Sequence, residues 1–249
     1  MYVTSDIIRN TKFVDKPNED FIICDSKNNI FILLDGVSRD RENGKYPNPS
    51  PAKEVSELLG TQIHLGIYSA LSDSMDILKI IKDSILESNR LVANYNIKNE
   101  LSFFAGAVGI IAVLKDYKFY FCYIGDCSGR LIRESKIILF TEIQTDEINK
   151  HKKEYSSYEI RHVICNNPSH PYSYGVLNGN SHAEFFLRSG VLQVYPQDHI
   201  ILSSDGLEPF LSKLNSKKLQ ANCAEQLLQM AIIENNINQD DRSIIKIII

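Results

Sequence analysis

The stretch Ile200-Ile201-Leu202-Ser203-Ser204-Asp205-Gly206 is a short apolar run that ends in an acidic residue and a glycine. A second stretch with the same order of residue types, Phe31-Ile32-Leu33-Leu34-Asp35-Gly36, lies far upstream. Each stretch predicts a buried strand that carries a carboxylate at its end, where glycine allows a sharp turn and a close approach of a backbone carbonyl oxygen. Two or three such strand ends that converge would form a cage of oxygen ligands.

Three further acidic segments border predicted strands. Asn18-Glu19-Asp20 precedes the apolar run Phe21-Ile22-Ile23-Cys24, Gly125-Asp126 follows the run 119–124, and Asp240-Asp241 precedes the apolar end of the chain. Taken alone, an Asp-Gly pair after a strand is a common hairpin turn, and that alternative is open for each pair. The set of acidic strand ends, taken together, favours a shared site.

The composition is that of an ordinary globular domain. The chain has 249 residues, of which 43% are hydrophobic and 23% charged, so it can bury a core as one large domain or two small ones. No internal repeat and no shift in composition marks a boundary, and we expect a single domain over residues 1–249. The net charge of −4 gives no general attraction to nucleic acid or anionic membranes, and we expect neither as a partner.

Features that would indicate export are missing from the sequence given. The segment Met1-Tyr2-Val3-Thr4-Ser5-Asp6 lacks the basic-then-apolar pattern of a secretory signal, and no apolar run is long enough to span a bilayer. We therefore expect a cytoplasmic protein. The five cysteines are scattered without paired spacing, which predicts neither a disulfide framework nor a zinc site.

A hairpin is predicted near the start of the chain, with strands at 21–24 and 30–34 joined by a polar turn. The acidic triplet stands at the start of one strand, and Asp35 stands at the end of the other. Because these two ends are neighbours in an antiparallel pair, we expect Glu19, Asp20 and Asp35 to lie close together.

Two long amphipathic helices are predicted after this hairpin, because apolar residues recur at helical spacing through about residue 91. Ser50, followed by Pro51, is the candidate N-cap of the first helix, and Asp73 is the candidate N-cap of the second. We expect the helices to form an antiparallel pair that covers one sheet face.

The remainder of the chain predicts mostly strands around one long polar segment. Residues 103–140 predict a four-stranded meander. Residues 141–183 lack apolar periodicity, and a connection of that length is typical of a functional lid. Beyond it we expect two strands from Glu184 separated by Ser189-Gly190, a strand over 199–204, helices over 208–214 and 223–235, and a closing strand over 243–249.

The candidate ligands are all carboxylate or carbonyl oxygens, without histidine or cysteine. Hard oxygen donors select magnesium, manganese or calcium over zinc. A bound cation also explains why so many negative charges are gathered, since they would otherwise repel one another. Asp35 can bridge two ions with its two oxygens, an arrangement that activates a water and neutralises a phosphoryl group. This chemistry indicates hydrolysis of a phosphate ester.

Five motifs together resemble the metal-dependent protein phosphatases of type 2C. They occur in the order and rough spacing of that family over essentially the whole chain: Asn18-Glu19-Asp20, Asp35-Gly36-Val37, Gly125-Asp126-Cys127, Ser204-Asp205-Gly206-Leu207 and Asp240-Asp241-Arg242-Ser243. The resemblance implies an α+β fold, a four-layer α-β-β-α sandwich in which two antiparallel sheets are flanked by helix pairs. It also implies a site at one edge of the sandwich.

The resemblance further implies a role for each motif residue. Asp35 is similar to the bridging metal ligand, Gly36 to a carbonyl ligand, and Asp205 and Asp240 to the remaining ligands of the first ion. Asp126 is similar to the residue that holds a third ion together with Asp205, and Glu19 and Asp20 to the acidic pair that orients metal-bound waters. The implied cofactors are two or three Mg²⁺ or Mn²⁺ ions. Asp241 remains an alternative to Asp240.

The sequence departs from the family at one position. The usual phosphate-gripping arginine, four residues before the glutamate of the acidic pair, is replaced by Asp15. Lys16 follows it and is our candidate phosphate contact, with Lys12 and Arg39 as alternatives. Lysine supplies charge but not the two-pronged hydrogen bonding of arginine.

The implied function is hydrolysis of phosphoserine and phosphothreonine in proteins, by a metal-bound water at a two-metal site. The catalytic residues would be Asp35, Asp205, Glu19 and Asp20. We expect a monomer whose partners are a phosphorylated protein and a Ser/Thr kinase. The alternative, motivated by the missing arginine, is a catalytically weak relative that works as a metal- or phosphoprotein-binding regulatory module.

Overall fold

Alternating residues of strand β3 (Ile30–Gly36) face two different apolar layers. Ile32 and Leu34 pack toward helices, whereas Phe31 and Leu33 pack toward a second sheet. All four are fully buried, as expected for a strand covered on both faces. This strand therefore lies in the middle of a layered fold.

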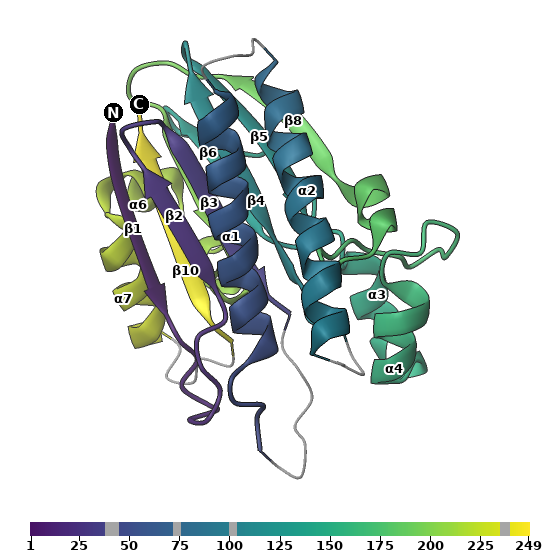
Figure 1. The fold of residues 1–249 in the computed structure, drawn as a ribbon. Coiled ribbons are helices and arrows are strands. Elements are labelled where there is room, and N and C mark those ends of the chain that lie inside the picture. The colour runs from purple at the N-terminus through teal and green to yellow at the C-terminus, as the bar shows by residue number, and fades with distance from the viewer. Residues whose placement is uncertain (38–44, 72–75, 100–103, 235–239) are drawn as a thin grey trace.

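The structure is a computed structural model that describes residues 1–37, 45–71, 76–99, 104–234 and 240–249. Two antiparallel five-stranded sheets lie face to face (Figure 1). Sheet 1 has the order β2 (Phe21–Asp25), β3, β4 (Ala107–Lys115), β5 (Lys118–Ile124) and β8 (Arg188–Gln193). Sheet 2 has the order β1 (Tyr2–Ile8), β10 (Arg242–Ile248), β9 (His199–Ser203), β6 (Ser128–Arg133) and β7 (Lys136–Leu139).

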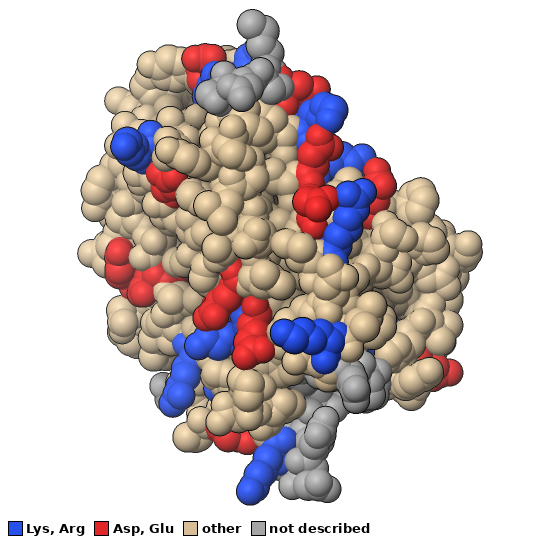
Figure 2. Space-filling view, viewed as in Figure 1, with Lys and Arg blue, Asp and Glu red and all other residues tan. Residues whose placement is uncertain are grey.

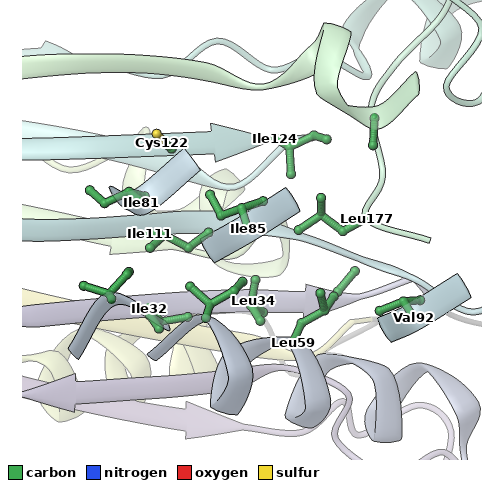
Figure 3. Close-up of a cluster of buried hydrophobic side chains, with 14 of the residues drawn as sticks. Ile32, Leu34, Leu59, Ile81, Ile85, Val92, Ile111, Cys122, Ile124 and Leu177 are labelled. Carbon is green, nitrogen blue, oxygen red and sulfur yellow. The ribbon is translucent and has the colours of Figure 1, made fainter. Parts of the chain in front are cut away.

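Helices cover the outer face of each sheet, so the expected α+β sandwich is confirmed. Sheet 1 is covered by α1 (Pro51–Ala70) and α2 (Ile77–Lys98), which lie side by side in Figure 1. Sheet 2 is covered by α5 (Glu208–Leu211), α6 (Ser216–Ala221) and α7 (Ala224–Glu234) on the opposite side. Figure 3 shows the apolar layer under α1 and α2, where Leu59 and Ile85 meet Ile32 and Leu34 of β3.

The helix starts agree in part with the expected caps. The side chain of Ser50 accepts a hydrogen bond from the backbone N–H of Lys53 and caps α1, as predicted. The cap of α2 is Asp76, which accepts from the N–H of Lys79. The expected cap, Asp73, lies outside the described residues.

The predicted meander over 103–140 is wrong, because β5 and β6 belong to different sheets. Strand β5 pairs with β4 and β8, and β6 pairs with β7 and β9. The chain crosses between the sheets at Gly125, whose φ of +86° disfavours other residues. A Cβ at Gly125 would also come within 2.3 Å of Val108. The crossing places Asp126 between the two sheets.

The two strands expected after Glu184 are a single strand, β8, preceded by a 3-10 helix, η3 (Ser181–Phe186). Ser189-Gly190 lies inside the strand instead of in a turn, since Gly190 pairs with Phe121. A Cβ at Gly190 would approach the Phe121 ring to 2.6 Å, so glycine here admits a neighbouring ring. Helix α6 was not predicted.

The segment expected to be a lid contains short helical turns at the edge of the sandwich (Figure 1). These are α3 (Asp146–His151), η1 (Lys152–Glu154), α4 (Ser157–Glu159) and the π-helical turn η2 (Ile160–Ile164). Ile148 and Ile164 are buried and join the layer between the sheets. The segment is therefore packed onto the sandwich, which its polar sequence did not indicate.

Surface features are consistent with the composition. Figure 2 shows acidic and basic residues interspersed over the face that carries α1 and α2, with no continuous basic area among the described residues in that view. None of the described helices combines the length and apolar character needed to cross a bilayer. All five cysteines are free.

The layered packing gives a prediction for α1. Leu59 is fully buried under this helix, whereas Leu65 is 51% exposed on it. Replacing Leu59 with alanine should lower the free energy of unfolding by about 2–5 kcal/mol because it leaves a cavity. The matched change Leu65→Ala should shift it by less than about 0.5 kcal/mol. Urea denaturation measures both, and equal effects would contradict the four-layer packing.

Candidate metal centre

Four aspartates from separate segments line one cavity of about 240 Å³. Asp35 stands near the end of β3, Asp205 follows β9, Asp126 follows β5, and Asp240 precedes β10. The cavity is also lined by Gly36, Val37, Val108, Thr145, Ile148, Asn149, Lys152, Ile160, Tyr174 and Val176. All five residues proposed as metal ligands from the sequence therefore meet at one place, although 205 positions separate Asp35 from Asp240 in the chain numbering.

Asp20 and Asp35 are brought together by the hairpin of β2 and β3. Phe21 pairs with Leu34, so the two aspartates are opposite each other just beyond that pair. Both carboxylate oxygens of Asp20 are buried and lack a hydrogen bond of normal geometry among the described residues, although the Ser204 and Ser243 hydroxyls lie near enough to favour its charged form. Oδ1 of Asp205 is likewise buried without a partner there. Such oxygens are costly to bury unless something binds them.

Burial and the charges of neighbouring aspartates raise the pKa values of these carboxyl groups. Burial raises the pKa of Asp35 well above its usual range, and the charges of Asp20 and Asp205 raise it further. Burial, together with the charge of Asp241, raises the pKa of Asp20 to about 8. Burial also raises the pKa of Asp205 to about 7. In the absence of a cation, the cluster therefore retains protons near neutral pH.

Two further predicted ligands, Gly36 and Asp126, are fixed by their surroundings: Gly36 by close packing and Asp126 by a hydrogen bond. A Cβ at Gly36 would come within 2.7 Å of the carbonyl oxygen of Glu19, so only glycine fits this strand end. The hydroxyl of Thr145 donates a hydrogen bond of 3.0 Å to Oδ2 of Asp126. Burial nevertheless raises the pKa of Asp126. Thr145 was not identified from the sequence, because nothing in its local pattern distinguishes it within the polar segment.

The structure separates the roles of the two adjacent aspartates before β10. Asp240 lines the cavity, with its side chain 48% exposed. Asp241 is 2% exposed, and its oxygens accept hydrogen bonds from the backbone N–H groups of Asn10 at 2.7 Å and Glu19 at 3.0 Å. Asp241 therefore ties the N-terminal segment to β10, and Asp240 is the one available to a ligand.

Glu19 is turned into the protein. Its Oε1 accepts hydrogen bonds from the Tyr46 hydroxyl at 2.5 Å and from the Ser50 hydroxyl. Its Oε2 lies 3.4 Å from the ammonium of Lys16. Neither Asp20 nor Glu19, the acidic pair expected to orient waters, is among the described residues that line the cavity. Asp20 is buried next to Asp35, and Glu19 fixes the start of α1.

Lys16 is also buried, at 5% exposure. Its ammonium lies 3.1 Å from Asp240, 3.2 Å from Asp241 and 3.4 Å from Glu19. Lys16 is not among the described residues that line the cavity. Lys16 therefore neutralises part of the charge of these three carboxylates. Its position does not favour the predicted contact with a substrate phosphate.

The two alternatives to Lys16 are no better placed. Lys12 is exposed, and its ammonium lies 5.2 Å from the centroid of the Phe13 ring. Arg39 lies outside the described residues.

The chemistry of the cavity fits a hard divalent cation. Within the described residues, no group of three or more acidic, histidine or cysteine side chains is placed so that it could hold a metal ion as it stands. The donors that line the cavity are nevertheless carboxylate, carbonyl, hydroxyl and amide oxygens, which Mg²⁺ and Mn²⁺ prefer. A bound cation would also satisfy Oδ1 of Asp205 and offset the mutual repulsion of the carboxylates.

Comparison with known proteins identifies the fold. No protein-family model matches the chain. No curated protein matches it in sequence. Among solved structures, the serine/threonine phosphatase PstP/Ppp of Mycobacterium tuberculosis superposes with a TM-score of 0.72 at 17% identity, covering 98% of this chain and 97% of that one.

Two further structures agree with this match. The catalytic domain of PstP in complex with two manganese ions gives a TM-score of 0.69 at 16% identity, over 98% of this chain and 96% of that one. PppA, a key regulatory component of the T6SS in Pseudomonas aeruginosa, gives 0.72 at 14% identity, over 100% and 99%. The chain thus has the fold of bacterial serine/threonine phosphatases, as the five motifs predict.

The raised carboxyl pKa values predict how stability depends on pH. In the unfolded chain an aspartate has a pKa of about 4, whereas in the folded, metal-free protein the pKa is about 8 for Asp20 and about 7 for Asp205. Between these values the folded protein binds more protons than the unfolded chain, so its stability falls as the pH rises. The melting temperature in EDTA should therefore be lower at pH 8 than at pH 5.5. Mn²⁺ should raise it most at pH 8, where protons compete least.

Asp35→Asn is the matched variant for this experiment, since it removes one charge from the cluster without changing its size. It should flatten the dependence of melting temperature on pH. A melting temperature in EDTA that rises from pH 5.5 to pH 8 would contradict the proposed crowding of the carboxylates.

The position of Lys16 predicts a structural role. Lys16→Met should lower the free energy of unfolding by about 3–5 kcal/mol, because it leaves the buried Glu19 and Asp241 without their cation. Lys12→Met, which changes an exposed lysine nearby, should have an effect below about 0.5 kcal/mol. Urea denaturation in EDTA compares the two. If both variants match the parent protein, the buried ion-pair arrangement is wrong.

Proposed function

We propose that this protein is a metal-dependent phosphatase that hydrolyses phosphoserine and phosphothreonine in proteins. The observation that carries the proposal is the meeting of Asp35, Asp126, Asp205 and Asp240 in one cavity. The fold shared with serine/threonine phosphatases supports it, as does the neighbour crystallised with two manganese ions. Location in the cytoplasm, a monomeric state and a partner kinase remain predictions.

In this proposal each cavity carboxylate has a distinct task. Asp35, Asp205, Asp240 and the carbonyl of Gly36 would hold two Mg²⁺ or Mn²⁺ ions, and Asp126 with Asp205 would hold a third. When bound, the ions supply positive charge that activates a water and offsets the charge on the phosphoryl oxygens. The Thr145 hydroxyl fixes the orientation of Asp126 through its hydrogen bond.

Asp20 and Glu19 contribute in different ways. Asp20 lies next to Asp35, whose pKa its charge helps to raise, but it is not among the described residues that line the cavity, so its role in orienting a water stays a prediction. Glu19 acts indirectly, because its bonds to Tyr46 and Ser50 hold the start of α1 against Gly36. Glu19 is therefore a positioning residue in this structure.

A catalytically weak, regulatory relative is the second candidate. It is favoured by one observation: the ammonium of Lys16 is engaged by Glu19, Asp240 and Asp241, and Lys16 itself is not among the described residues that line the cavity. Against it stands Asp205, which lines the cavity and whose buried Oδ1 has no hydrogen-bond partner among the described residues, a costly arrangement in a cavity that binds nothing.

Hydrolysis of a chromogenic phosphate ester in Mn²⁺ separates the two candidates. The parent protein should turn over only with added metal, and Asp205→Asn should lose about 10²-fold or more in kcat/KM. Asp116→Asn is the control. Asp116 is exposed and follows the last residue of β4, whereas Asp35 pairs with Val108 at the start of that strand. Absent or metal-independent turnover would favour the regulatory module.

A further inference from the structure

The cavity has one basic residue among its described lining residues, Lys152. The other charged residues there are four aspartates, so the cavity is strongly acidic before any ion binds. A phosphate ester that approaches such a cavity meets repulsion unless positive charge stands near its entrance. Bound ions would supply that charge at the carboxylates, and Lys152 supplies positive charge from among the lining residues.

Lys152 differs from the two cations that precede it, Lys150 and His151, in having no ion pair among the described residues. Within the described residues, no ion pair or hydrogen bond to its ammonium is found, and the residue is exposed. Lys150, two residues earlier, pairs with Glu147 at 2.5 Å, and His151 lies 2.9 Å from Glu154. Lys153 is also exposed without an ion pair, but of the two only Lys152 is among the described residues that line the cavity, so Lys152 is the cation available to a ligand there.

The backbone around Lys152 is fixed to the sandwich. Ile148, one turn earlier on α3, is 3% exposed and packs between the sheets. His151 stacks on Tyr172 with ring centroids 4.1 Å apart. Thr145 ties the start of α3 to Asp126. These contacts hold the Lys152 backbone at the cavity and leave its side chain free to move.

Lys152 is also electrostatically linked to the carboxylates. Its charge contributes to lowering the pKa of Asp126, which burial raises. This influence agrees with the place of both residues in the lining of the same cavity.

We propose that Lys152 binds a non-bridging oxygen of the substrate phosphate at the entrance of the cavity. The inference rests on the proposed phosphatase function. An ammonium donates charge-assisted hydrogen bonds to phosphate oxygens from a flexible stem, which suits capture of a ligand at an entrance. Lys152 thus supplies the phosphate contact for which Lys16 is unsuitably placed.

A competing role for Lys152 is to offset the charge of Asp126 alone. The two roles predict different effects of Lys152→Ala on phosphate binding. Loss of a phosphate contact weakens phosphate binding and leaves Mg²⁺ binding unchanged or slightly tighter. Loss of a cation that acts only on Asp126 tightens Mg²⁺ binding and leaves phosphate binding unchanged.

The test compares Lys152→Ala and Lys152→Arg with the control Lys153→Ala, an exposed lysine next to it that does not line the cavity. With a phosphopeptide substrate and Mg²⁺, Lys152→Ala should raise both KM and the inhibition constant of inorganic phosphate by about 10-fold or more. Lys152→Arg should keep most of the affinity, and Lys153→Ala should match the parent protein.

Calorimetric binding of inorganic phosphate in Mg²⁺ provides a readout that does not depend on turnover. A larger dissociation constant for phosphate in Lys152→Ala, but not in Lys153→Ala, supports the inference. This result would hold even if the parent protein proves inactive, and inactivity would overturn only the proposed function. Unchanged phosphate binding in Lys152→Ala overturns the inference, whether or not Mg²⁺ binding becomes tighter. Equal weakening in Lys153→Ala would also overturn it, because the effect would then be one of general charge.

Discussion

Mutual repulsion among carboxylates is the constraint on which this structure depends. Burial, and after it the charges of neighbouring aspartates, raises the pKa values of Asp20, Asp35 and Asp205. Side chains that repel one another in this way stay together only if a rigid frame holds them. The two sheets are that frame, because β3 and β9 are buried on both faces and cannot move apart without exposing apolar side chains.

The same constraint explains the buried charges behind the cavity. Lys16 contacts Glu19, Asp240 and Asp241, so part of the negative charge is neutralised from within the protein. Asp241 accepts hydrogen bonds from the backbone of Asn10 and Glu19, which attaches the N-terminal segment to β10. Segments from the two ends of the chain are thus joined directly beneath the site, and the cavity retains only Asp240 of the adjacent pair.

The division between framework and entrance follows from this arrangement. Strand ends supply the carboxylates, whose positions are set by sheet register and by glycines such as Gly36 that leave no room for a side chain. The segment 141–183 supplies polar and basic groups, held by Ile148 and by Thr145. The sequence of the segment that carries Lys152 can vary without a change in the sheets that fix the carboxylates, as is common for connecting segments on a rigid scaffold.

The sequence by itself determined the strands that end in Asp35 and Asp205, the capped helix from Pro51, and the oxygen-rich character of the site. These features depend on local periodicity and on residue types. Only the tertiary structure decided which sheet received β6, which of Asp240 and Asp241 lines the cavity, and that Lys16 faces buried carboxylates. The reason is physical: a local pattern fixes how a segment folds, whereas the partner of a strand and the surroundings of a charge depend on segments distant in the chain.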